Sequence, residues 1–226
     1  MVIKKEMGKK KKLIRFNENK SFEKLFEPIA LDLINHDFIY KGKWLTDYFK
    51  RSGRLVLELG CGYGEYTVGQ AKMMPQDNFI GIDIKGARLN LGVKEIEKEK
   101  MPNACFIRTQ IEMIPAIFDK EVDEIWLTFP DPRPDRARRR LTYPLFLERY
   151  KKVLKNNGVV CLKTDSKELY DYTCELINEL GYKTIEKTDD LYKSPLLEKI
   201  PFIQTKYEKR FLAENKNICF LRFSFN

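Results

Sequence analysis

A glycine-rich turn and a later carboxylate have the spacing of a pocket for a nucleoside-containing cofactor. The run E-L-G-C-G-Y-G at residues 58–64 follows a short apolar stretch, and Asp83 ends a second apolar stretch 23 residues after Gly60. Glycines where a strand meets a helix allow a tight turn and a close approach of a ligand to the backbone. A carboxylate at the end of the next strand can accept hydrogen bonds from the hydroxyl groups of a ribose.

The turn itself distinguishes between two classes of cofactor. A dinucleotide fingerprint reads G-x-G-x-x-G, but the sixth position is Glu65 when counted from Gly60 and Thr67 when counted from Gly62. An acid at a helix start disfavours a pyrophosphate, which prefers the positive end of the helix dipole. S-adenosyl-L-methionine has no phosphate and carries a sulfonium cation, so Glu58 and Glu65 favour it as the cofactor.

A further acid, Asp131, lies between an apolar stretch and a run of arginines. Pro132 restricts the backbone of Asp131 to an extended conformation. We expect Asp131 to project from the carboxyl end of a central strand, where substrate would meet cofactor. Five arginines occur within residues 133–140, and arginine binds phosphate with paired hydrogen bonds and stacks on bases. We favour an RNA-gripping role for this run over that of a solvated charged turn.

From residue 54 onward, apolar runs alternate with amphipathic segments, which is typical of a parallel sheet covered on both faces. Continuous apolar runs, as in strands buried on both sides, predict strands at 54–59, 78–84, 104–108, 123–129 and 159–163. Helices are predicted at 65–74, 86–100, 144–155 and 166–180. Residues 217–225 are expected to form a last strand, with 182–187 pairing beside it as an antiparallel edge. The prediction is an α/β fold with a mostly parallel seven-stranded sheet.

The N-terminal region differs from the rest of the chain. Residues 1–12 contain six lysines and one glutamate, and we expect residues 1–20 to form a flexible basic arm, with or without a role in binding. Residues 21–226 are predicted to form a single domain. Within it, Phe22, Leu25 and Phe26 have helical spacing and are expected to pack in the core.

The amino-acid composition further limits the classes of function that fit the sequence. The 42 Lys and Arg exceed the 33 Asp and Glu, and the net charge of +9 favours a polyanionic partner. The five cysteines contain no C-x-x-C pair and are expected to be buried and reduced. A single histidine, His36, argues against a multi-histidine metal site or a histidine triad, so no metal is expected. No run has the ~20 apolar residues of a membrane span, and a cytoplasmic protein is expected.

In combination, the motifs resemble the transfer RNA (guanine-N(7)-)-methyltransferases. The similar segments are E-L-G-C-G-Y-G-E from residue 58, G-I-D-I from residue 81, T-F-P-D-P-x-P from residue 128 with R-R-R-L-T after it, L-K-T-D at 162–165 and T-K-Y-E-K at 205–209. The resemblance covers about residues 54–212. It implies a Rossmann-like class I methyltransferase that transfers a methyl group from S-adenosyl-L-methionine to N(7) of a guanine in the variable loop of tRNA.

The resemblance also implies roles for individual positions. Positions implied to bind the cofactor are Glu58, Gly60, Gly62, Asp83, Gln110 and Asp131, and Asp131 is also the implied catalytic residue. Positions implied to bind the substrate are Arg133, Arg136, Asp165, Thr205, Lys206, Tyr207 and Glu208. Arg133 occupies a position where the family often has tryptophan, and Asp135 one where it often has lysine. The basic substrate contact is therefore expected at Arg133 or Arg136.

Several alternatives remain open from the sequence. One is a methyltransferase that acts on another RNA base, a protein or a small molecule, and another is an NAD-binding oxidoreductase, against which the missing glycine at position 65 argues. A third is an RNA-binding protein that has lost catalysis. Tyr207 is expected either to stack on the target base or to pack in the core. Both a monomer and a homodimer are compatible with the sequence.

Overall fold

The computed structural model describes residues 13–226 and contains one eight-stranded sheet, with the strand order β1-β4-β3-β2-β5-β6-β8-β7. Its strands are β1 (Leu25–Phe26), β2 (Leu55–Leu59), β3 (Asn78–Asp83), β4 (Ala104–Arg108), β5 (Val122–Thr128), β6 (Leu154–Thr164), β7 (Lys183–Thr188) and β8 (Cys219–Ser224). The pairs among β1 to β6 are parallel, and β8 pairs antiparallel with both β6 and β7. The predicted mostly parallel sheet with an antiparallel C-terminal edge is confirmed.

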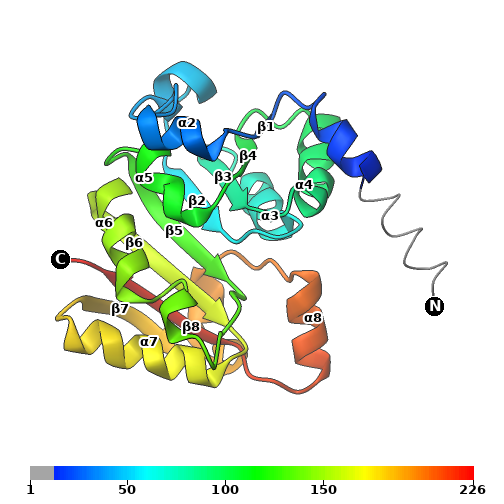
Figure 1. Ribbon diagram of the computed structural model, residues 1–226. Helices are drawn as coiled ribbons and strands as arrows, with labels where there is room; N and C mark the ends of the chain where they lie inside the picture. The colour runs from blue at the N-terminus through cyan, green and yellow to red at the C-terminus, as the bar shows by residue number, and fades with distance from the viewer. Residues whose placement is uncertain (1–12) are drawn as a thin grey trace.

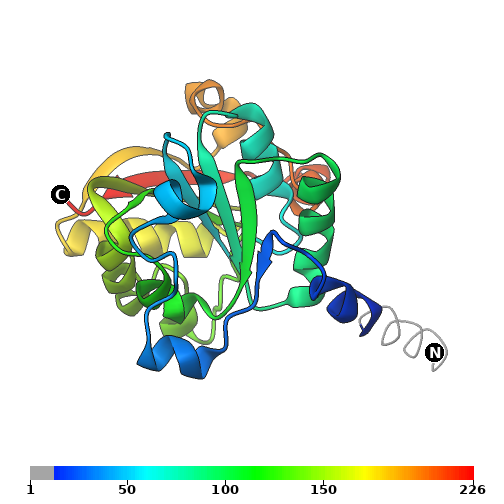
Figure 2. The ribbon, with the colours of Figure 1, turned by 90° about the horizontal axis from the view of Figure 1, so that it is seen from above.

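Helices lie on both sides of this sheet (Figures 1 and 2). The α-helices are α2 (Ala30–Asn35), α3 (Glu65–Met73), α4 (Gly86–Lys98), α5 (Ile114–Ile117), α6 (Pro144–Val153), α7 (Lys167–Glu179) and α8 (Lys206–Ala213). The π-helical turn η1 (Trp44–Phe49) and the 3-10 turns η2 (Ile111–Met113), η3 (Ala137–Arg139), η4 (Leu191–Lys193) and η5 (Pro195–Lys199) complete the helical elements of the described residues. Buried side chains of α3, α4 and α8 belong to one core cluster, and those of α2, α5, α6 and α7 belong to the other.

The alternating directions of the side chains along β2 explain how one strand contributes to both core clusters. Leu55 and Leu57 belong to the α6 side of the sheet, whereas Val56 belongs to the α3 side, because successive side chains of a strand point to opposite faces. Glu58 is the polar residue of this fully buried strand, and its carboxylate faces Thr67 of α3. An ionisable carboxyl group is thus buried at the end of a central strand.

The sheet has eight strands, so the prediction of seven is wrong. The additional strand, β1, pairs in parallel with β4 through Leu25 and Phe26, which were predicted from their helical spacing to pack as a helical stripe. The backbone N–H of Phe106 in β4 donates to the carbonyl of Lys24 at 2.9 Å, so the extra strand satisfies an edge that would otherwise lack backbone partners. As neighbours on a strand, Leu25 and Phe26 pack against opposite core clusters.

The segment before β1 contacts α4. Residues 13–19 are helical, and the buried side chain of Asn19 donates a hydrogen bond of 3.0 Å to the carbonyl of Gly86. Glu18 forms an ion pair of 2.7 Å with Lys94. These contacts join the segment to the main domain. The flexible arm expected for residues 1–20 stays a prediction for residues 1–12, which lie outside the described residues.

Candidate active site

A cavity of about 990 Å³ opens at the carboxyl ends of β2, β3, β4, β5 and β6. Strand β2 pairs with β3 on one side and with β5 on the other, so the order of the strands reverses at β2. In an open α/β sheet such a reversal leaves a crevice beyond the strand ends, because the connections leave in opposite directions. The cavity occupies this position.

The turn between β2 and α3 requires its glycines. Gly60, Gly62 and Gly64 have φ values of 80°, 57° and 76°, which are left-handed conformations that other residues adopt only with strain. A Cβ atom on Gly64 would lie 2.5 Å from the ring of Phe106, whereas one on Gly62 would meet nothing within 4 Å. Gly64 is therefore needed for the fit of α3 to the sheet, and Gly62 leaves open space at the cavity.

Asp83 is fixed at the end of β3 by two backbone donors. The N–H of Gly62 donates to Oδ2 at 2.9 Å, and the N–H of Lys85 donates to Oδ1 at 2.7 Å. Asp83 is buried, with 9% of its surface exposed, and it lines the cavity together with Gln110. Its carboxylate is thus oriented before any ligand binds.

Glu58 lies beneath the glycine turn in a nearly closed environment. Its carboxylate accepts a hydrogen bond of 2.8 Å from the backbone N–H of Thr67 and further bonds from the hydroxyls of Thr67 and Thr128. Burial raises the pKa of Glu58 to about 7, although these hydrogen bonds favour its ionised form. The group therefore titrates near neutral pH.

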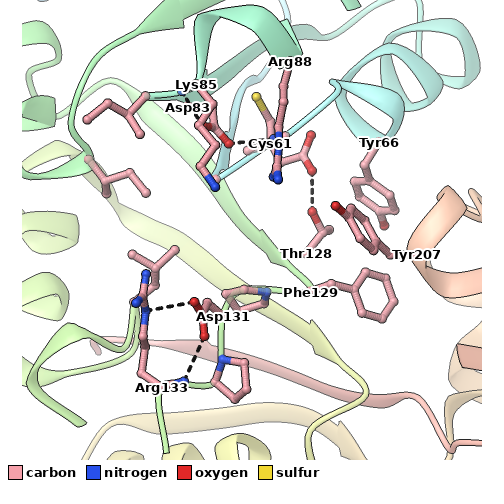
Figure 3. Close-up of a pocket in the computed structure, with 18 of the residues that line it drawn as sticks. Cys61, Tyr66, Asp83, Lys85, Arg88, Thr128, Phe129, Asp131, Arg133 and Tyr207 are labelled. Carbon is pink, nitrogen blue, oxygen red and sulfur yellow. Dashed lines mark hydrogen bonds and ion pairs between the residues drawn. The ribbon is translucent and has the colours of Figure 1, made fainter. Parts of the chain in front are cut away.

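Asp131 occupies the opposite wall of the cavity, with Asp83 and Cys61 across from it (Figure 3). Its Oδ2 atom lies 3.0 Å from Nε of Arg133, and the backbone N–H of Arg133 donates to Oδ1 at 3.2 Å. The side chain of Asp131 is 59% exposed. Arg133 has a φ of 45°, a strained conformation of the kind found where the surrounding structure fixes a functional group.

The cavity brings together most of the sequence-predicted residues. Those that line it are Glu58, Gly60, Gly62, Asp83, Gln110, Asp131, Arg133, Asp165, Thr205 and Tyr207. Three do not line it. Arg136 is exposed outside the cavity. The backbone N–H of Lys206 donates to Glu65, which lines the cavity, but Lys206 itself does not line it. Glu208 is fully buried in an ion pair with Lys163. Consecutive helical residues point about 100° apart, so the first turn of α8 cannot present every side chain to one cavity.

Two of these placements bear on alternatives that the sequence left open. Tyr207 lines the cavity with 36% of its surface exposed, which favours the stacking role over core packing. Of the two arginines considered for the basic contact, Arg133 lines the cavity and Arg136 does not, which favours Arg133.

The arginine run divides into two groups that the sequence did not distinguish. Arg138 and Arg139 are exposed and line the cavity. Arg140 is 5% exposed, donates to the carbonyl of Pro132 at 2.9 Å and pairs with Glu168. The expectation that all five arginines bind RNA is therefore wrong for Arg140, which joins the backbone at Pro132 to Glu168 of α7.

Further cations at the cavity were missed by sequence reasoning. Lys85 and Arg88 approach from the start of α4, Arg149 from α6 and Arg210 from α8. Lys85 and Arg88 lie two and five residues after the strand-end acid Asp83, and that position could have indicated them. Arg149 and Arg210 carry no local signal, because only the tertiary arrangement brings α6 and α8 to the same edge.

Within residues 13–226, no helix is long and apolar enough to cross a membrane, and no group of three His, Cys, Asp or Glu side chains could hold a metal ion. The five cysteines are all free, and only Cys174 is not fully buried, which agrees with their expected role as small core residues.

Three comparisons place the chain among known proteins. Residues 52–221 match the family described as "Putative methyltransferase". The chain is 47% identical over 221 residues to the tRNA (guanine-N(7)-)-methyltransferase of Christiangramia forsetii, with 96% of this chain and 99% of that protein covered. It is 45% identical over 218 residues to the enzyme of the same description from Bacteroides fragilis, with coverages of 96% and 86%.

The fold is similar to that of a 30S ribosomal A1408 methyltransferase from an uncultured bacterium, with a TM-score of 0.61, 19% identity and coverage of 84% of this chain and 96% of that one. The sheet order, the glycine turn and the strand-end cavity define a Rossmann-like methyltransferase. Within this class, the chain belongs to the tRNA (guanine-N(7)-)-methyltransferase family.

Proposed function

We propose that the protein transfers a methyl group from S-adenosyl-L-methionine to N(7) of a guanine in the variable loop of tRNA in the cytoplasm. The observation that carries the proposal is one cavity with two chemically different walls. One wall contains the glycine turn with Glu58 and Asp83, and the other contains Asp131 beside exposed arginines. A small cationic cofactor suits the first wall, and an RNA suits the second.

The residues of the first wall fit the cofactor. Asp83 is already oriented toward the cavity and can accept ribose hydroxyls, Gly62 leaves space where a side chain would otherwise project, and Gln110 supplies an amide for the adenine. When bound, S-adenosyl-L-methionine supplies a methyl group on a positively charged sulfur. The carboxylates of Glu58 and Asp83 provide negative charge nearby.

The second wall suits a polyanion. Arg138 and Arg139 lie at the cavity and have no ion pair within residues 13–226, so their charges are available to phosphates. Tyr207 offers an exposed ring on which an unstacked base can lie. Asp165 and Thr205 add polar groups at the same edge.

The chemistry requires alignment more than proton transfer. N(7) of guanine has a lone pair in the ring plane and needs no deprotonation before it attacks a methyl group. The protein must therefore align the base with the methyl carbon. The base gains positive charge as the bond forms, and the carboxylate of Asp131 would stabilise that charge. Arg133 now neutralises Asp131 in part, and its transfer to an RNA phosphate would leave the carboxylate free to act.

The test is methylation of an unmodified tRNA transcript with labelled S-adenosyl-L-methionine, followed by digestion to nucleosides and by chain cleavage at 7-methylguanosine. We expect label in 7-methylguanosine at one guanine of the variable loop. A transcript with adenine at that position is the matched control and should remain unlabelled. Label on another base, or labelling of the control to the same extent, would refute the assignment.

A further inference from the structure

Two opposite charges are buried together where β6 approaches α8. Nζ of Lys163 lies 2.7 Å from Oε1 of Glu208, and the two side chains are 2% and 0% exposed. Removing charges from water is costly, and a buried ion pair offsets the cost only with good geometry and further hydrogen bonds. Neither residue lines the cavity, although each lies within a motif that the sequence marked as functional.

Further hydrogen bonds connect the pair to the chain that leads into α8. The hydroxyl of Tyr192 donates to Oε1 of Glu208 at 2.9 Å and accepts from the amide of Gln204 at 3.0 Å. Nζ of Lys163 also donates to the carbonyl of Ile203 at 3.4 Å. The pair therefore holds residues 203–204, which immediately precede the cavity residue Thr205.

The first turn of α8 is attached at two other points. Thr205 caps the helix by accepting from the N–H of Glu208 at 3.2 Å, and the N–H of Lys206 donates to Glu65 at 2.9 Å. Glu65 is the first residue of α3, directly after the glycine turn. A helix of only eight residues is marginal by itself, so its position depends on contacts of this kind. Figure 1 shows α8 at the periphery of the fold, beside the sheet.

We propose that Lys163 and Glu208 are positioning residues whose buried ion pair holds the start of α8 so that Thr205 and Tyr207 face the substrate side of the cavity. Glu208 then acts without touching the RNA, unlike the substrate-binding role that the family resemblance implies for it. This inference deepens the proposed function and rests on it for the identity of the substrate.

The experiment compares Lys163→Met, Glu208→Gln and the double variant Lys163→Met/Glu208→Leu, with Lys72→Met as the control. Lys72 forms exposed ion pairs between α3 and α4. Hydrogen exchange of residues 205–213 is measured without RNA, and the KM for tRNA and the Kd for S-adenosyl-L-methionine are measured separately. The exchange measurement tests the position of α8 even if the wild type proves not to methylate tRNA, and that second outcome would refute only the proposed function.

In each single variant we expect exchange in α8 and the KM for tRNA to rise by about tenfold or more, because one charge is left buried without its partner. The Kd for S-adenosyl-L-methionine should stay within about twofold, as should all values for Lys72→Met. The apolar double variant leaves no buried charge but also lacks the hydrogen bonds to Ile203 and Tyr192, so exchange and KM should recover in part, to values between those of the single variants and wild type. If exchange recovers but the KM stays high, Glu208 contacts the RNA, and if the single variants exchange like wild type, the pair does not hold α8. Either result overturns the inference.

Discussion

The backbone N–H of Gly62 donates a hydrogen bond of 2.9 Å to Oδ2 of Asp83, which joins the glycine turn after β2 to the end of β3. Two segments that would contact different parts of a cofactor are thereby fixed relative to each other in the unliganded protein. Such preorganisation lowers the cost of ordering the site on binding.

Alanine substitutions at two glycines of the turn should separate cofactor binding from folding. Gly62→Ala places a Cβ in open space at the cavity and adds left-handed strain of about 1–2 kcal/mol. We expect a small drop in Tm. We also expect the Kd for S-adenosyl-L-methionine to rise by about tenfold or more, because the added methyl group occupies space at the cavity and a loss of only ~1.4 kcal/mol of binding free energy raises the Kd tenfold. Gly64→Ala adds a clash with Phe106 and should lower Tm much further. Unchanged cofactor affinity in Gly62→Ala, measured by calorimetry, would contradict this assignment.

The stability of the protein should carry a pH dependence due to Glu58. Its pKa is raised to about 7 from the ordinary 4.5, so between these values the folded state keeps a proton that the unfolded state has lost. The contribution of Glu58 to the free energy of unfolding therefore decreases as pH rises from about 4.5 to about 7. Glu58→Gln stays neutral, and its Tm relative to wild type should increase over this window. A Tm difference that is constant from pH 5 to 8 would exclude the effect.

The same group should link cofactor binding to proton release. A sulfonium cation in the cavity favours the ionised form of Glu58, so binding at a pH below about 7 should release a proton. The Kd for S-adenosyl-L-methionine should fall as pH rises toward that value. Calorimetry in two buffers of different ionisation enthalpy measures the release directly, and Glu58→Gln should show less of it. Equal proton release by the variant and the wild type would assign it to another group.

Asp131→Asn should impair catalysis without affecting the fold. The side chain is 59% exposed, and surface substitutions usually change stability by less than about 0.5 kcal/mol. Loss of a preorganised charge that stabilises the transition state costs on the order of 100-fold in kcat. Single-turnover rates at saturating tRNA, with cofactor affinity measured in parallel, would show the loss in the chemical step. Full turnover in the variant would remove Asp131 from the mechanism.

The exposed arginines should be distinguishable by salt dependence. Arg138 and Arg139 line the cavity and Arg136 does not. The double variant Arg138→Gln/Arg139→Gln should weaken tRNA binding and reduce the slope of log affinity against log salt by about 1 for each phosphate that the variant no longer binds. Arg136→Gln is the matched control of equal chemistry outside the cavity. An equal change of slope in the control would mean that the RNA follows a different path.

Much of the fold followed from local patterns. The strands before the glycine turn and before Asp131 are mostly apolar, and the alternation of strands and helices predicted the parallel sheet. The antiparallel C-terminal edge was predicted from residues 182–187 beside a last strand. The strand β1 could not be predicted in this way. Leu25 and Phe26 form a strand only because the edge of β4 offers backbone partners, and those partners are about 80 residues away in the sequence.

The sequence by itself determined the residue types of the site and the positions along the chain of the strands that carry them, since turns and strand ends depend on residues close together in the chain. Only the tertiary structure decided which charges face the cavity. Arg139 lines the cavity while its neighbour Arg140 is buried against α7, and Glu208 turns inward to Lys163 while Tyr207 remains at the cavity wall. The direction of a charged side chain depends on partners from distant segments, because a buried charge needs a partner of opposite charge to offset the loss of its hydration.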